Sequence, residues 1–152
     1  MSDKEKDQIK QLLRLYAMIP DSPPCNEGCN KCCGPVLMLP SEARILGLAE
    51  PITPHDENLK CSFIKDGRCS VYEKRPFTCR IFGTAKCKPM NCPDHKTSGT
   101  QSQEWIEMMF VFYFGLIDTP EDAELLERTV EKYTGAAVEH DKGIVWNNGG
   151  KQ

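Results

Sequence analysis

The sequence lacks an apolar run long enough to cross a lipid bilayer. The longest one, Trp105 to Ile117, has 13 residues and contains Glu107, whereas a membrane-spanning helix needs about 20. The first seven residues are rich in charge and no apolar signal region follows them, which is typical of a protein that stays in the cytoplasm. We therefore expect a cytoplasmic location and no membrane partner.

Several signatures of catalysis and of nucleic-acid binding are also missing. The sequence has no Gly-rich nucleotide loop, no Ser/His/Asp order and no Glu flanked by metal ligands, so it does not indicate a nucleotide-dependent enzyme or a hydrolase. No dense basic cluster stands out and the net charge is −3. A nucleic-acid partner is not expected, because phosphate binding requires clustered positive charge.

Cysteine, in contrast, is abundant, with nine in 152 residues. Four of them lie within nine residues, at Cys25, Cys29, Cys32 and Cys33. Turns at Gly28 and at the intervening asparagines let successive thiolates converge on one point, as a tetrahedral ion or an iron–sulfur cube requires. A disulfide knot and inert buried thiols are the alternatives. A reducing cytosol disfavours disulfides, and the number of cysteines is odd, so we expect metal binding.

The first predicted element is an amphipathic helix over residues 3–18. Ile9, Leu12, Leu13 and Tyr16 recur at helical spacing, and Ser2 with Glu5 three residues later predicts a capping box. Packing on the core is the expected role of this helix, with partner docking as the alternative.

The middle of the chain predicts short elements around the remaining cysteines. Residues 36–39 form a buried extended run, residues 40–46 a short helix with Ser41 as its N-cap, and Pro76 opens a helical turn. Asp66-Gly67 predicts a β-hairpin between Cys61 and Cys69. A two-residue loop places the two cysteines on opposite faces and a three-residue loop on the same face, and a shared metal favours the three-residue loop.

The C-terminal part predicts two helices. The first is strongly apolar and covers residues 101–117, with a strand pair as the alternative, and the second is amphipathic and runs from Thr119-Pro120 to Tyr133, closed by Gly135. The fold class is therefore a small, mostly α single domain with irregular cysteine-rich loops and one short hairpin. Its parts are an N-terminal helix in residues 1–20, a cysteine-cluster core in 25–95, a helical pair in 101–134 and a frayed tail in 147–152.

Four features stand together in one order: Cys25-x3-Cys29-x2-Cys32-Cys33, then Cys61, then Gly67-Arg-Cys69-Ser-Val-Tyr72, then Arg75-Pro76-x2-Cys79-Arg80. Over residues 25–92 this pattern resembles the YkgJ-type cysteine-cluster family, which is described as a zinc- or iron-chelating domain. The resemblance implies a small, largely helical domain with irregular metal-binding loops. A relative of this family is a flagellin lysine N-methylase, so a cluster-dependent, methyltransferase-like enzyme is one of the alternatives.

The resemblance also implies a set of metal ligands. Carried over position by position, they are Cys25, Cys29, Cys32, Cys33, Cys61, Cys69 and Cys79, with Cys92 as an eighth. The sequence departs from the family pattern in its first gap, which has three residues where family members often have two, and in the additional thiol of Cys87. His95 follows Cys92 after two intervening residues and is a less favoured ligand for a zinc site.

The residues next to the ligands bear on the charge of the site. Arg68, Arg75 and Arg80 lie beside Cys69 and Cys79, and their guanidinium groups offset the negative charge of a thiolate site. Ordinary surface arginines are the alternative. We expect Tyr72 to pack beside the metal.

The identity of the metal and the number of sites stay open. Cys32 and Cys33 are neighbours, so their sulfurs face two metal sites, or one binds and the other lies nearby. A thiolate-only ligand set favours a [4Fe–4S] cluster over zinc. The sequence predicts a metal-binding protein with a redox, metal-transfer or accessory role and a protein partner. A zinc-stapled interaction module is the alternative, and a small-molecule substrate stays undetermined.

Overall fold

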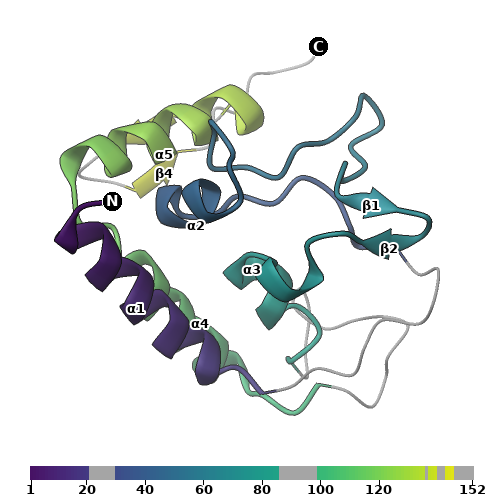
Figure 1. Cartoon of the computed structure of the whole chain (residues 1–152), viewed down its shortest axis with the longest axis horizontal. Coiled ribbons are helices and arrows are strands. Elements are labelled where there is room, and N and C mark those ends of the chain that lie inside the picture. Colours follow the sequence, from purple (N-terminus) through teal and green to yellow (C-terminus); the bar gives the residue numbers. More distant parts are fainter. Residues whose placement is uncertain (21–29, 86–98, 136, 140–142, 146–152) are drawn as a thin grey trace.

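The computed structural model describes residues 1–20, 30–85, 99–135, 137–139 and 143–145. The elements, in chain order, are α1 (Asp3–Ala17), α2 (Pro40–Ile45), β1 (Ile64–Lys65), β2 (Arg68–Cys69), η1 (Tyr72–Lys74), α3 (Phe77–Ile81), α4 (Gln103–Phe114), α5 (Pro120–Thr134), β3 (Ala137–Glu139) and β4 (Gly143–Val145). The expected small, mostly α fold with a short antiparallel hairpin is confirmed (Figure 1).

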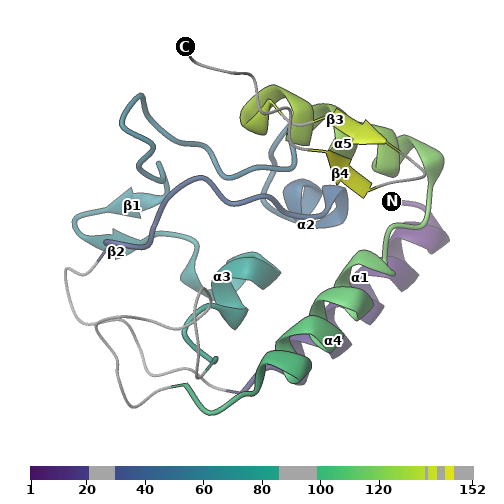
Figure 2. The same cartoon turned by 180° about the vertical axis from the view of Figure 1, so that it is seen from behind.

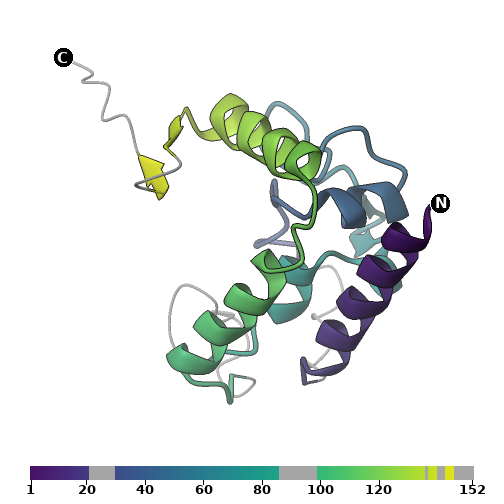
Figure 3. The ribbon, with the colours of Figure 1, turned by 90° about the vertical axis from the view of Figure 1, so that its left-hand side faces the viewer.

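The helices and the first hairpin occupy opposite sides of the molecule. Helices α1 and α4 lie along each other at one edge, and the β1–β2 hairpin lies at the other (Figures 1 and 2). Helix α2 packs against both α1 and α5, and α3 lies between the helical edge and the hairpin. Figure 3 shows α5 running across the top of this arrangement.

Helix α1 begins as its sequence predicts. The Ser2 side chain accepts a hydrogen bond from Glu5 N–H, and the Glu5 carboxylate accepts one from Ser2 N–H. The predicted buried face is wrong at Leu13, which is 56% exposed. The buried face consists of Gln8, Leu12 and Leu15, because the neighbouring helices lie on that side.

Helix α2 begins at Pro40, and its N-cap lies two residues earlier than predicted. Its N-cap is Leu39, with Pro40 in the first turn, so the prediction of Ser41 as N-cap is wrong. Proline suits the first helical position because its φ is already helical and the missing N–H has no partner there. The Glu42 carboxylate replaces a capping side chain by accepting the Leu39 N–H at 3.0 Å. Residues 36–39 are extended as predicted, with an isolated bridge between Leu37 and Ile52.

The β1–β2 hairpin has a two-residue turn, so the preference for a three-residue loop is wrong. Lys65 pairs with Arg68, and Ile64 with Cys69. Asp66 and Gly67 both have positive φ, 49° and 77°, which is the geometry of the tight turns that Asp-Gly favours. Cys61 lies before β1 in an isolated antiparallel bridge with His55, outside the β1–β2 pairing, so the alternation of faces along β1 does not govern it.

The hydrophobic core lies among the helices. It consists of Leu12, Leu15, Leu39, Phe77, Ile81, Ala85, Ile106, Met109 and Tyr113. Phe77 stacks on Tyr113 with ring centroids 4.2 Å apart, and neither Phe77 nor Ile81 exposes any surface. The core therefore fixes α3, which also carries Cys79.

A buried carboxylate joins four helices inside this core. Glu42, 2% exposed, accepts hydrogen bonds from the hydroxyls of Tyr16 on α1 and Tyr113 on α4. It also accepts the N–H groups of Leu39 at 3.0 Å and of Phe77 at 2.6 Å. Burial, followed by the adjacent carboxylate, raises the pKa of both tyrosines, so both stay neutral donors.

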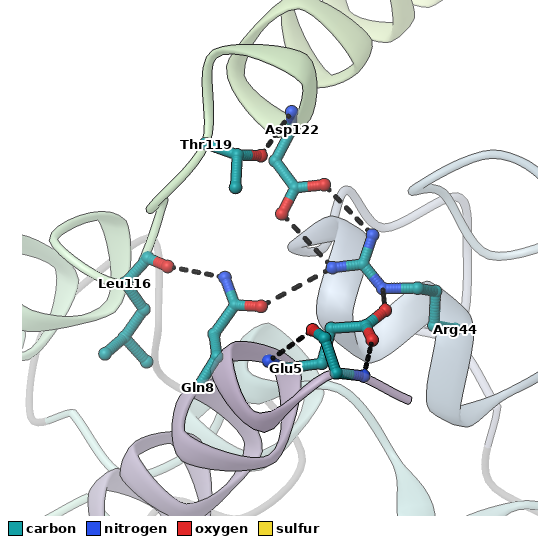
Figure 4. Close-up of polar contacts among 7 residues, drawn as sticks. Glu5, Gln8, Arg44, Leu116, Thr119 and Asp122 are labelled. Atoms are coloured by element: carbon teal, nitrogen blue, oxygen red, sulfur yellow. Dashed lines mark hydrogen bonds and ion pairs between the residues drawn. The ribbon is translucent and has the colours of Figure 1, made fainter.

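A second polar network holds α5 on α2 (Figure 4). The Arg44 guanidinium donates to the two Asp122 carboxylate oxygens at 3.0 and 3.1 Å. The amide of Gln8 donates to the Leu116 carbonyl at 2.7 Å. The hydrogen bonds from Arg44 hold the pKa of Asp122 below its ordinary value.

The C-terminal helical pair forms as predicted. Thr119 caps α5, and Gly135 closes it with φ 67°. Helix α4 leaves Met108, Val111 and Phe112 exposed, with Val111 at 70%. In the part of the chain that the structure describes, no helix has the length and apolarity needed to span a membrane. The β3–β4 hairpin was not predicted, and the predicted frayed tail lies outside the described residues.

Candidate metal centre

Five of the eight predicted ligands lie in the described residues. They are Cys32, Cys33, Cys61, Cys69 and Cys79, and none of them is in a disulfide with another described cysteine. The others, Cys25, Cys29 and Cys92, lie outside the described residues, as do the less favoured Cys87 and His95. Cys32 is exposed, and the other four described cysteines are partly buried.

The backbone brings the end of the first cysteine cluster beside the hairpin. Cys61 N–H donates to the Cys33 carbonyl at 3.2 Å, although 27 residues separate them in the sequence. The neighbouring Ser62 N–H donates to the Pro54 carbonyl at 2.7 Å, and Cys33 N–H closes a turn on Asn30 at 3.0 Å. Segments from two distant parts of the chain therefore meet at Cys33 and Cys61.

Cys79 shares its surroundings with two further thiols. Burial raises the pKa of Cys79 to about 12, and negative charge on Cys61 and Cys69 raises it further. Cys61 precedes β1, Cys69 ends β2 and Cys79 lies in α3, so the fold brings cysteines from three segments within electrostatic range of one another. Without a cation in that region the Cys79 thiol keeps its proton at neutral pH, and a bound metal ion would have to displace that proton.

The described side chains do not form a complete coordination shell. Within residues 30–85 and the other described ranges, no three Cys, His, Asp or Glu side chains stand in a group able to hold a metal ion. The ligand set therefore stays a prediction, with three of its eight members outside the described residues.

Arg75 has a buried donor with no acceptor among the described residues. Its guanidinium lies over the Tyr72 ring, 3.9 Å from the ring centroid to Cζ, and within the part of the chain that the structure describes its buried Nε has no hydrogen-bond partner. Leaving such a donor unsatisfied costs about 1–3 kcal/mol. The positive charge of Arg75 lowers the pKa of Cys79, against the larger effect of burial. A thiolate or sulfide acceptor in this region fits the charge and the unsatisfied N–H.

Arg80 binds two backbone carbonyls of the segment that precedes α3. It donates through Nε to the Arg75 carbonyl at 2.8 Å and through a terminal nitrogen to the Glu73 carbonyl at 2.6 Å. Its guanidinium also covers the Tyr16 ring at 4.3 Å. These contacts fix the segment that leads into α3, so Arg80 positions Arg75 and Cys79 through the backbone. Arg68 lies exposed in β2.

Glu42 is a further residue that acts on the thiols, a role that the sequence did not predict. The charge of Glu42 also raises the pKa of Cys79, after burial and the two neighbouring thiols. The signal was a glutamate two residues after a proline at the start of a helix, which reads equally well as an ordinary first-turn carboxylate.

Comparisons with known proteins assign no family to the chain. No protein-family model matches the chain, and neither the search of curated proteins nor that of solved structures found a match.

Proposed function

We propose that the chain is a metal-binding protein in which cysteine thiolates hold an iron–sulfur cluster or zinc. Its role is redox chemistry, metal transfer or assistance to another protein. The resemblance of residues 25–92 to the YkgJ-type family agrees with this proposal. The proposed ligands among the described residues are Cys32, Cys33, Cys61, Cys69 and Cys79, and Cys25, Cys29 and Cys92 complete the proposed set.

The observation that carries the proposal is the backbone contact between Cys33 and Cys61, supported by the electrostatic influence of Cys61 and Cys69 on Cys79. Negative charge on Cys61 and Cys69 would raise the pKa of Cys79, and the buried Nε of Arg75 has no acceptor among the described residues. A cation held by thiolates removes both problems, because it stabilises the ionised sulfurs and gives Arg75 a charged acceptor. The bound group would supply Lewis acidity or electron transfer according to its identity.

Anaerobic purification followed by metal analysis tests the proposal. A brown protein with iron and sulfide in comparable amounts identifies an iron–sulfur cluster, and a colourless protein with stoichiometric zinc identifies a zinc site. Cys61→Ser and Cys79→Ser should each lose most of the metal, because a missing thiolate opens the coordination shell. Cys87→Ser is the matched control and should keep it. Metal-free wild-type protein, or unchanged metal content in both ligand variants, would refute the proposal.

Arg75→Lys tests the fit of the arginine to the centre. Lysine keeps the positive charge but removes the planar Nε–H donor. For an iron–sulfur cluster we expect a lower reduction potential, since hydrogen bonds to sulfur raise it. For zinc we expect weaker binding in a competition with a chelator. An unchanged potential and an unchanged zinc affinity would assign Arg75 to packing alone.

A second candidate function, a zinc-stapled interaction module, is favoured by the surface of α4. Met108, Val111 and Phe112 form an exposed apolar stripe, with Glu104 and Glu107 exposed at its N-terminal end. This distribution suits a partner helix that is apolar in the middle and basic at one end. Val111→Lys should abolish capture of a synthetic peptide of that type while leaving metal content unchanged. Equal binding of an acidic peptide would contradict this candidate.

A further inference from the structure

An open pocket of about 330 Å³ lies against two of the thiols. Its lining residues include Cys33 and Cys61 together with the polar residues Asn30, Asp56, Lys60 and Lys65. This volume is at the small end of the range for ligand sites and corresponds to roughly ten water molecules. The pocket therefore admits a small molecule rather than a folded segment of a partner.

The charges in the pocket favour an anion. Lys60 and Lys65 bring two ammonium groups, and within the described residues neither makes an ion pair or a side-chain hydrogen bond. Asp56 brings one carboxylate, but its Oδ1 already accepts the N–H groups of Asn58 and Lys60, both at 2.9 Å. The Asp56 carboxylate is thus occupied by hydrogen bonds within its own loop, and the two lysine charges are available for a ligand.

The backbone places these cations beside the thiols. Lys60 directly precedes Cys61, whose N–H donates to the Cys33 carbonyl at 3.2 Å. Lys65 is the last residue of β1 and lines the same pocket. A ligand with two anionic oxygens can meet the lysines and Asn30, while its remaining atoms face Cys33 and Cys61. An anion that contacts the lysines therefore also lies next to the sulfur atoms.

We propose that this pocket binds a compact dianion of the phosphate or dicarboxylate class beside the metal-binding thiols. The interpretation of this pocket as the substrate or ligand site of a metal centre rests on the proposed function. Binding of the anion itself needs only the described pocket residues.

Isothermal titration of the full chain with inorganic phosphate and, separately, with malonate tests the proposal at constant ionic strength. At least one dianion should bind saturably with a stoichiometry of one. Binding of phosphate alone identifies a phosphate site, and binding of malonate alone a dicarboxylate site. In the double variant Lys60→Glu/Lys65→Glu the Kd should rise by about tenfold or more. The control Lys10→Glu/Lys74→Glu carries the same change of net charge outside the pocket and should stay within about threefold of wild type.

Two results would overturn the proposal. One is the absence of saturable binding of either dianion to the wild-type protein, and the other is an equal rise in Kd in both double variants. Titrating both metal-loaded and chelator-treated protein separates this proposal from the proposed function. If the protein binds the dianion through the lysines but never holds metal, the metal site is refuted and the anion pocket stands. If the protein holds metal but binds no dianion, the anion pocket is refuted and the metal site stands.

Discussion

Substitution of the buried carboxylate Glu42 by glutamine should destabilise the protein strongly without changing its volume. Oε1 accepts the Tyr16 hydroxyl and the Phe77 N–H, and Oε2 accepts the Leu39 N–H and the Tyr113 hydroxyl. A glutamine side chain has one acceptor oxygen, so its NH₂ must face one of these two pairs of donors.

The less costly orientation points the NH₂ toward Leu39 and Tyr113. The Leu39 N–H then still has the Tyr113 oxygen at 2.8 Å as an acceptor, and the Tyr113 hydroxyl can rotate to accept from the amide. Two charge-assisted hydrogen bonds are lost in this orientation. Each is worth about 1.5–3 kcal/mol, and partial replacement leaves a net loss of about 2–4 kcal/mol.

Thermal denaturation followed by far-UV circular dichroism, at one fixed metal state, measures this loss. For a chain of this length each kcal/mol lowers Tm by about 2–4 °C, so Glu42→Gln should lower it by about 5–15 °C. Glu50→Gln is a control at the exposed surface, where the Glu50 carboxylate accepts hydrogen bonds from Lys132 and Tyr133. Its Tm should change by less than about 2 °C. An unchanged or raised Tm for Glu42→Gln would refute the reasoning and show that relief of charge burial outweighs the lost bonds.

Three further predictions concern the helices. Arg44 lowers the pKa of Asp122, so the stability that this carboxylate contributes is present above its unfolded pKa of about 3.9 and is lost as the pH falls through the folded value. Asp122→Asn should therefore flatten the acid limb of a plot of stability against pH. The pKa of Tyr16 is raised by burial and then by its carboxylate partner, so its contribution is complete below about pH 10 and is lost as the pH rises further, and Tyr16→Phe should weaken this alkaline loss measured by urea unfolding. Gly135→Ala meets no atom within 4 Å but keeps a φ of 67°, so calorimetry should show a loss of about 1 kcal/mol that comes from the backbone alone, and a neutral result would contradict this account.

Local signals in the sequence predicted most of the helical fold. Ser2 with Glu5, Thr119 before Pro120, and Gly135 after the last turn each satisfy backbone groups within a few residues, so neighbouring residues suffice to predict them. The errors arose where distant residues decide. Leu13 is exposed because the position of neighbouring helices, rather than periodicity, selects the buried face of α1.

The candidate site shows the same division between local and distant effects. Spacing alone singled out the cysteines, but the contact between Cys33 and Cys61 depends on a loop that returns across 27 residues. Arg75 and Arg80 flank Cys79 symmetrically in the sequence. Only the fold shows that Arg80 bonds to backbone carbonyls and that Arg75 retains an unsatisfied donor.

The short helix α3 gives the thiols unequal freedom to move. Phe77 and Ile81 anchor it completely in the core, with Cys79 between them on the same turn and a half of helix. Cys32, in contrast, lies exposed in a turn with no helix or strand around it. For the proposed metal site this difference predicts that an ion exchanges its bonds first at Cys32 and last at Cys79.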